Sequence, residues 1–493
     1  MQPWNDIINT ALLGTDKRKP DAMQLTGQLA EAAASIQQNT TDKEEQFLQL
    51  AAVLFNYRQC GVMPLHKEGV GIAKAAPEEK KYCSPVAMQL LKDILDADND
   101  ALFQLWLQQC AAKQFIVTPE MVPRLFNEAR LQKKLQTLIA SCCGKRGEWL
   151  SRLNPDWNFS AGSDEELWQT GTPEQRRSIL HQLRQSDPQK ALAWLQQTWA
   201  QEDANEKTEL LQLLTANIGE ADVPFLESLA GEKSKKVKDT VLKLLKQVPS
   251  STVVKQYEDV LAQSVRIKKE KSFLGMVKHT SVHFQLPAAF DESIFKTGIE
   301  KLSNNKSFSD EEYIIFQLIQ SVPPRFWEAH LQSEPEGIIG MFQKDKNIKK
   351  FLLGLIIALV NFKDTRWAIA FMQHSEVFYI DILPLLPVQQ QEFYSKKFIE
   401  QNPNDVIDRQ LMRNDEWSTE LTKLIFIHTA KNIYQYNRSF YNNHVLRFPA
   451  AIASQLEQCA PPEEHLRNSW SNMSEHIAKL ISLKTQTGKA FNE

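Results

Sequence analysis

Three similar hexapeptides decide the fold that this sequence predicts: SILHQL at residues 178–183, ELLQLL at 209–214 and TVLKLL at 240–245. They start at positions 178, 209 and 240, so a spacing of 31 residues separates each from the next. A second segment of helical character follows each of them, at residues 191–197, 223–229 and 253–261. Turn-forming residues separate these segments, namely Asp187-Pro188, Gly219, Pro224 and Pro249.

A helix pair repeated at one spacing is typical of a solenoid, because a single pair cannot cover its apolar face and buries it on the next pair. The spacing of 31 residues is shorter than the HEAT or armadillo unit of about 40 residues. It is close to the tetratricopeptide unit of about 34, but the Trp, Gly and Tyr signature of that unit is missing. We therefore predict an all-α fold, a HEAT-like α-solenoid of stacked helix pairs, and leave the repeat subclass open.

Helical patterning extends beyond the three repeats. We expect an N-terminal helical domain with irregular loops at 1–165, the repeats at 166–265, a further repeat-like helical region at 266–484 and a frayed tail at 485–493. Expected helices outside the repeats lie at 47–55, 86–94, 100–113, 123–142, 311–320, 348–361, 366–374, 388–401 and 417–432. The helix at 123–142 should end at Gly144 with a left-handed cap. A long connection at 61–85 and a short strand or irregular insertion within 272–285 are the expected exceptions.

The composition supports a soluble helical protein. Of 493 residues, 42% are apolar, 24% are charged and only 17 are Gly, and the net charge is −3. A chain of this length exceeds a single core, and its near-neutral charge gives no global attraction to nucleic acid or an acidic membrane. The start of the chain does not resemble a signal peptide, and its most apolar run, 351–360, is too short to span a membrane. We expect a cytoplasmic protein whose six cysteines are reduced and mostly fill the core.

The clearest candidate site is the turn formed by Gly144, Lys145, Arg146 and Gly147. Two glycines let backbone N–H groups approach an anion, and the two cations add charge, so the turn could bind phosphate or a partner. It lacks the spacing of a P-loop. We favour the structural alternative, a helix cap in which Trp149 and Trp157 pack against the helices and Arg146 pairs with a carboxylate.

Basic residues give a second candidate. Runs occur within 233–238, 266–271 and 344–350, and the candidate phosphate contacts are Lys235, Lys236, Lys238, Lys268 and Lys269. If the runs shared one face they could follow a nucleic-acid backbone. Neighbouring acidic residues favour solvated helix ends and loops instead.

No catalytic, cofactor or metal site is predicted. His66, His181 and His374 are far apart, and no H-E-x-x-H or G-x-S-x-G motif accompanies them. His279 and His283 would share one face of a helix, but no nearby Cys or carboxylate completes a metal shell.

Two motifs resemble a known family. The segments WND at 4–6 and ALLGTDKR at 11–18, and later CGKRGEWL at 143–150 leading to NPDW at 154–157, are similar to DUF5691, a family of uncharacterised bacterial proteins. The resemblance implies a helical-repeat protein with no established catalytic residue. It also implies gene neighbours of the MoxR-type AAA+ ATPase, von Willebrand A-domain and SWIM zinc-finger classes, and hence a partner in a chaperone-like complex.

Three functional hypotheses remain. We favour a non-enzymatic scaffold or adaptor that binds a protein partner, with an AAA+ ATPase or A-domain protein as the expected partner. The second hypothesis is a nucleic-acid-binding solenoid, and the third is an enzyme with a site near the turn from Gly144 to Trp157.

Overall fold

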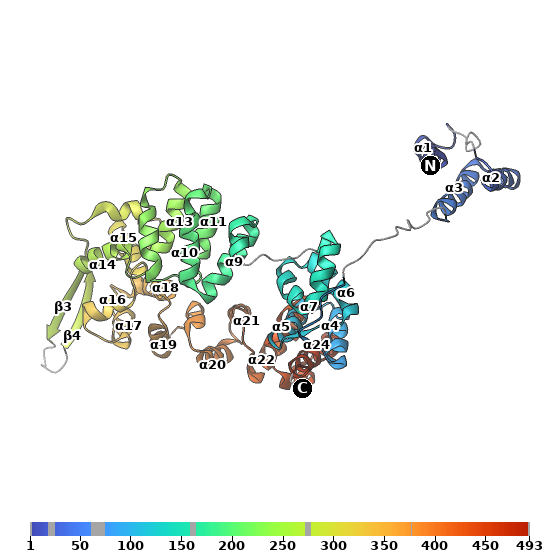
Figure 1. The fold of residues 1–493 in the computed structure, drawn as a ribbon. Coiled ribbons are helices and arrows are strands. Elements are labelled where there is room, and N and C mark those ends of the chain that lie inside the picture. Colours follow the sequence, from blue (N-terminus) through green and yellow to red (C-terminus); the bar gives the residue numbers. More distant parts are fainter. Residues whose placement is uncertain are drawn as a thin grey trace. The chain divides into compact units, whose positions relative to one another are not determined.

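The computed structural model describes residues 2–17, 25–60, 74–157, 164–271, 278–375 and 377–491. The described residues are mainly helical, so the all-α prediction is confirmed (Figure 1). It divides into two compact units, Met1–Lys74 and Ala75–Glu493. None of the helices in the described residues is both long and apolar enough to cross a membrane.

The first unit consists of three helices: α1 (Gln2–Leu13), α2 (Gln28–Asn39) and α3 (Lys43–Cys60). Helix α3 packs against both of the others and contains the helix expected at 47–55. Its core is small, because Ile7, Leu50 and Leu54 are the buried apolar residues around which it forms.

One core of the second unit joins residues from opposite ends of its sequence. Buried residues from 83–143 and from 399–491 form one continuous cluster, and helix α24 contacts α4 and α5. The elements of this core are α4 (Pro85–Asp96), α5 (Asp100–Ala112), α6 (Val122–Leu131), α7 (Gln136–Leu153), α21 (Pro403–Leu411), α22 (Thr419–Lys431), α23 (Arg438–His444) and α24 (Glu464–Lys489), with the short parallel strands β1 (Lys81–Tyr82) and β2 (Phe115–Ile116).

Two expectations for this region are wrong. Residues 123–142 do not form one helix, because α6 ends at Leu131 and α7 begins at Gln136. Residues 485–491 are not a frayed tail, because α24 continues to Lys489 and the Phe491 side chain is only 4% exposed. The Phe491 ring lies 5.2 Å from that of Trp106, so the core holds the end of the chain in place.

Helices are present at all six segments predicted for the three pairs. The repeated hexapeptides lie in α9 (Pro173–Ser186), α11 (Ala204–Leu213) and α13 (Lys235–Leu245), and the second segments lie in α10 (Pro188–Thr198), α12 (Val223–Ser228) and α14 (Thr252–Ser264). Helix α9 contacts α11, and α11 contacts α13. The sequence sets the helix starts, since Thr172 and Gln175 form a capping box before α9 and Ser234 and Ser251 cap α13 and α14.

An antiparallel hairpin follows the helix pairs. It consists of β3 (Val265–Lys271) and β4 (Lys278–Phe284), so the strand structure begins seven residues before the expected segment at 272–285. The expected helices beyond it are confirmed apart from shifts at their ends: α15 (Asp310–Gln320), α18 (Leu352–Phe362), α19 (Thr365–His374) and α20 (Val388–Phe398), with α16 (Arg325–Leu331) and α17 (Pro335–Lys344) between α15 and α18. The apolar run at 351–360 lies mainly in α18, whose residues are largely buried in the core.

Candidate functional site

Gly144 interrupts α7 in its middle. Its φ of 60° and ψ of −161° belong to a region that is almost exclusive to glycine. The sequence predicted a positive φ here, but the left-handed helical cap is wrong because ψ is extended. Directly after this break, the backbone N–H groups of Lys145 and Arg146 both donate to the Glu78 carboxylate, to Oε2 and Oε1 respectively, at 2.8 Å each.

The turn therefore holds an anion that belongs to this chain. Free N–H groups at the start of a helical segment carry partial positive charge and attract carboxylates. A Cβ atom on residue 144 would collide with the Glu78 carboxylate, so the close approach also requires glycine. The ammonium group of Lys145 lies 3.1 Å from the carboxylate of Glu148, and this hydrogen bond raises the pKa of Lys145.

Glu78 reaches the turn from the segment that leads into α4. Strand β1 follows Glu78 in the chain and pairs in parallel with β2. Next to it, the Cys83 N–H donates to the Ile116 C=O at 2.8 Å. The Val117 N–H in turn donates to the Cys142 C=O at 2.9 Å, close to the break at Gly144. The Glu78 carboxylate and the pairing of β1 with β2 thus hold the segment before α4 against α7.

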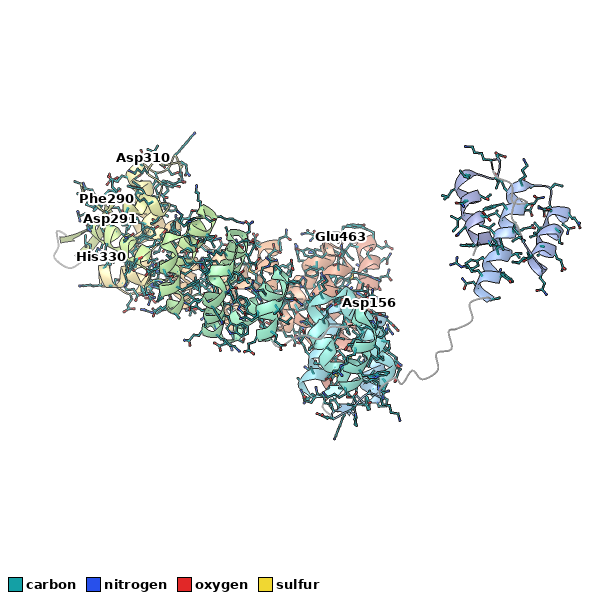
Figure 2. All side chains as sticks on the ribbon, turned by 45° about the horizontal axis from the view of Figure 1, so that its top comes forward. Asp156, Phe290, Asp291, Asp310, His330 and Glu463 are labelled. Atoms are coloured by element: carbon teal, nitrogen blue, oxygen red, sulfur yellow. The ribbon has the colours of Figure 1, made fainter. Side chains whose placement is uncertain are left out.

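The other residues of the motif at 143–157 pack α6 against α7. A Cβ atom on Gly147 would lie 3.2 Å from Cζ of Phe126, which shows how closely the two helices approach. The Trp157 ring packs 5.7 Å from that of Phe126, and its Nε1 donates to Asn127 Oδ1 at 3.3 Å. Asp156, labelled in Figure 2, lies 3.5 Å from the guanidinium of Arg130 on α6.

Trp149 is partly buried, and Lys145 and Arg146 present their side chains at or near the surface. These contacts give the turn a structural role, which is the interpretation that we favoured. The carboxylate predicted to pair with Arg146 is that of Glu78, and it accepts from the Arg146 backbone N–H. That the turn also binds a partner or ligand stays a prediction.

A family described as a family of unknown function, DUF5691, matches residues 6–491. The chain belongs to the DUF5691 family. Its match covers nearly the whole chain, including both compact units. No curated protein and no solved structure matches it.

The DUF5691 chain brings together three cysteines that the sequence separates. Cys83 Sγ lies 3.6 Å from Cys110 Sγ, and Cys110 also hydrogen-bonds Cys142. This second bond lowers the pKa of Cys142 and raises that of Cys110. All three thiols are buried, in agreement with their expected place in the core. Their proximity could not be predicted, because no short spacing motif links positions 83, 110 and 142.

Arg184 is a buried residue that the sequence analysis missed. It is 1% exposed and pairs with Asp222, with both guanidinium-to-carboxylate distances at 3.0 Å. The same guanidinium donates to the C=O groups of Leu214, Ala216 and Asn217, and so joins α9 to the turn that follows α11. A signal was present, since position 184 lies four residues after a buried Leu and hence on the apolar face of its helix.

The candidate phosphate contacts lie on different kinds of element. Lys235, Lys236 and Lys238 are exposed at the beginning of α13. Lys268 and Lys269 lie on β3, and their side chains are outside the described part of the structure. The third run ends beside α18, where Lys350 pairs with Glu312 at 2.6 Å. A shared nucleic-acid-binding face therefore stays a prediction.

The histidines remain dispersed over the described elements. His181 is exposed on α9, His374 lies in the last turn of α19, and His66 lies outside the described residues. His279 and His283 lie on β4 and not on a helix, and His283 Nε2 is 3.4 Å from Ser281 Oγ. Within the described ranges, no group of three or more His, Cys, Asp or Glu residues could hold a metal ion.

Proposed function

We propose that this DUF5691 chain is a non-enzymatic protein-interaction scaffold. The helix pairs from α9 to α14 are a HEAT-like solenoid, and the exposed face of the first helices α9, α11 and α13 binds a protein partner. By family resemblance, a MoxR-type AAA+ ATPase or a von Willebrand A-domain protein is the proposed partner.

One observation carries the proposal: residues 31 positions apart in the first helices share the same exposure to solvent as well as the same position in the helix. Ile179, Leu210 and Val241 occupy equivalent positions in the three first helices, and all three are buried. A second row of equivalent positions, His181, Gln212 and Lys243, is exposed in all three.

A repeated inner row lets the pairs stack, and a repeated outer row leaves one polar face along the stack. Large surfaces of this kind suit protein binding, where a few central residues provide most of the affinity. The turn at Gly144 gives less support to an enzyme, because the chain's own Glu78 carboxylate already takes its backbone donors.

The test is affinity purification of the tagged full-length protein from its native cells, followed by mass spectrometry. Nuclease should be present, and low and high salt should be compared, since contacts to phosphate weaken steeply as salt rises. We expect a protein partner that survives both treatments. Recovery of nucleic acid alone in a parallel purification without nuclease would favour the nucleic-acid hypothesis.

A matched pair of variants places the partner on the proposed face. The double variant Gln212→Glu/Lys243→Glu changes two exposed residues of the first helices, and Gln196→Glu/Lys255→Glu makes the same chemical change on α10 and α14, where both residues are also exposed. The first variant should lose the partner and the second should keep it. Equal retention by both would show that the first-helix face is not the binding surface.

A further inference from the structure

The three first helices each carry a basic residue at the same place. The residues that cap them lie 31 positions apart, and each accepts a hydrogen bond from the first turn: Thr172, Asp203 and Ser234. A cation follows four positions after each cap, and the three cations are Arg176, Lys207 and Lys238. Helices α9, α11 and α13 lie side by side in this order, so the cation recurs from one first helix to the next (Figure 1).

The first cation is enclosed by partners from this chain. The guanidinium of Arg176 donates to the Glu202 carboxylate at 3.0 Å, and its Cζ lies 4.6 Å from the ring centre of Trp168 in α8 (Asp164–Thr170). Glu202 belongs to the segment just before α11, the next first helix. Only 16% of the Arg176 side chain is exposed. A carboxylate and the face of an aromatic ring both stabilise a cation placed between them.

The second cation repeats this arrangement. Lys207 Nζ lies 2.8 Å from the Glu232 carboxylate and 4.9 Å from the ring centre of Trp199. Trp199 Nε1 donates to the same carboxylate at 2.9 Å, so the ring, the cation and the carboxylate contact one another. Glu232 comes from the segment just before α13, and only 15% of the Lys207 side chain is exposed. Two successive first helices therefore use one chemistry at one position.

The third cation, Lys238, lacks both partners. Its side chain is exposed, and within the described ranges its ammonium group has neither a carboxylate nor an aromatic ring beside it. The short helical segment before α13, Leu229–Gly231, contains no aromatic residue. After α14 the chain enters the hairpin of β3 and β4, so no further first helix follows that could supply a carboxylate.

An apolar residue beside Lys238 is uncovered in the same way. Leu242 lies four residues after Lys238 and so on the same side of α13. The leucines at the equivalent positions of α9 and α11, Leu180 and Leu211, are both 0% exposed, whereas Leu242 is partly exposed. Lys238 and Leu242 form a surface, the Lys238 strip, whose counterparts on the two earlier first helices are covered.

The charges around the Lys238 strip are mainly positive. Helix α13 contains lysines at 235, 236, 238 and 243 and a single acidic residue, Asp239. Successive residues of a helix point about 100° apart, so Asp239 faces a different side from Lys238. Glu232 is already paired with Lys207. Lys246, two turns further along, is partly buried, and this burial lowers its pKa. A carboxylate is therefore the group that the Lys238 strip lacks.

We propose that a partner protein supplies the missing groups, and that an exposed segment with a carboxylate and an aromatic ring close together binds the Lys238 strip. The carboxylate pairs with the ammonium group of Lys238, and the ring covers the cation and Leu242. Lys238 points about 140° away from Lys243 of the exposed row, because five residues separate them in the helix. The Lys238 strip is thus a different surface from the first-helix face, and the two proposals can fail separately.

A library of random twelve-residue peptides displayed on phage provides the probe. It should be selected on the full-length protein and counter-selected on Lys238→Glu. We expect enriched peptides with Asp or Glu within a few residues of Trp, Tyr or Phe. The affinity should fall at least tenfold in Lys238→Glu, because two like charges then face each other. The matched control Lys243→Glu makes the same change on another exposed side of α13 and should keep the wild-type affinity.

Changes in an enriched peptide test the pairing directly. Replacing its acidic residue with Lys should weaken binding to the wild type and restore binding to Lys238→Glu. Replacing its aromatic residue with Ala should weaken binding to the wild type severalfold. The double variant Gln212→Glu/Lys243→Glu, which should lose the partner of the first-helix face, should bind the peptide as the wild type does. Equal thermal midpoints of Lys238→Glu and the wild type would show that the variant folds.

Four outcomes would overturn the proposal. One is the absence of any enriched peptide, and another is a set of enriched peptides that bind Lys238→Glu as tightly as the wild type. The third is binding of a single-stranded oligonucleotide that Lys238→Glu abolishes and that an enriched peptide does not displace, because the strip would then bind nucleic acid. The fourth is self-association of the wild-type chain that Lys238→Glu removes, because a second copy would then cover the strip.

Discussion

Single residues carry structural roles in this chain that depend on partners far away in the sequence. Glycine at position 144 is required by a positive φ and also by the approach of Glu78, 66 positions earlier. The sequence pointed to the first requirement, because two glycines flank a basic pair. It held no signal for the second, since no local pattern around a carboxylate in a long connection identifies the backbone N–H groups that will donate to it.

Replacing Gly144 with Ala should destabilise the second unit. The backbone strain alone costs about 1–3 kcal/mol, and the new methyl group would displace the Glu78 carboxylate. Thermal unfolding followed by circular dichroism measures the effect. The control is Gly488→Ala, where a Cβ atom meets nothing, and we expect it to be neutral or stabilising by about 0.5–1 kcal/mol. Similar losses in both variants would contradict the role of the turn.

His444 should make stability depend on pH. Burial lowers its pKa to about 4, with a further contribution from Arg447, whose Nη1 lies 3.5 Å from His444 Nδ1. In the unfolded chain the pKa of His444 is about 6.5. Between pH 6.5 and pH 4 the unfolded state therefore binds a proton at His444 that the folded state does not bind. This contribution to stability is present above pH 6.5 and is lost as the pH falls toward 4.

The variant His444→Asn should therefore show a shallower loss of stability between pH 6.5 and pH 4 than the wild type. Urea unfolding midpoints at several pH values would measure the slope. His465→Asn removes an exposed histidine of α24 and should keep the wild-type slope. Identical slopes for all three proteins would show that His444 titrates normally in the folded state.

At the scale of elements, local signals located most helices and missed two boundaries. Capping residues and prolines mark the starts of α9, α10 and α12, because they satisfy or avoid the free N–H groups of a first turn. The break between α6 and α7 contains neither Gly nor Pro, so the apolar pattern seemed continuous through residue 132. Helix α24 is absent from the expected helices, and its last residues fall in the expected tail, because its stability comes from packing and not from helix propensity.

Phe491→Ala should destabilise the core that joins the two ends of the second unit. A Phe-to-Ala change in a core costs about 3–5 kcal/mol, and the lost contact includes the Trp106 ring at 5.2 Å. Lys489→Ala removes an exposed side chain two residues earlier and should have little effect. Thermal midpoints compare the two. A Phe491→Ala midpoint equal to that of Lys489→Ala would restore the interpretation of a frayed tail.

At the scale of the whole molecule, the chain has separate hydrophobic cores. The core of the first unit contains only residues up to position 54. The second unit forms one core from residues 168–386 and another from its two ends. Length alone indicated more than one core. It could not indicate that residues 83–143 and 399–491 share one of them, because hydrophobic patterns do not identify their partners.

A chain that begins at Ala75 should fold without the first unit, since both large cores lie entirely within residues 75–493. Its thermal midpoint should match the main transition of the full chain. A chain of residues 75–398 should fail to fold the core around α4 to α7, because the other half of that core is missing. Equal protection of α4 to α7 from hydrogen exchange in both chains would contradict this arrangement.

The sequence alone determined what depends on neighbouring residues: the helical class, the spacing of 31 residues, most helix starts and the need for glycine at position 144. These features follow from side-chain periodicity and capping, which act over a few residues. The tertiary structure decided the features that join distant segments. Among these are Glu78 on the turn, the three cysteines in contact and Arg184 on Asp222. Each depends on long-range packing, whose specificity resides in the fit of whole surfaces and leaves no short pattern in the chain.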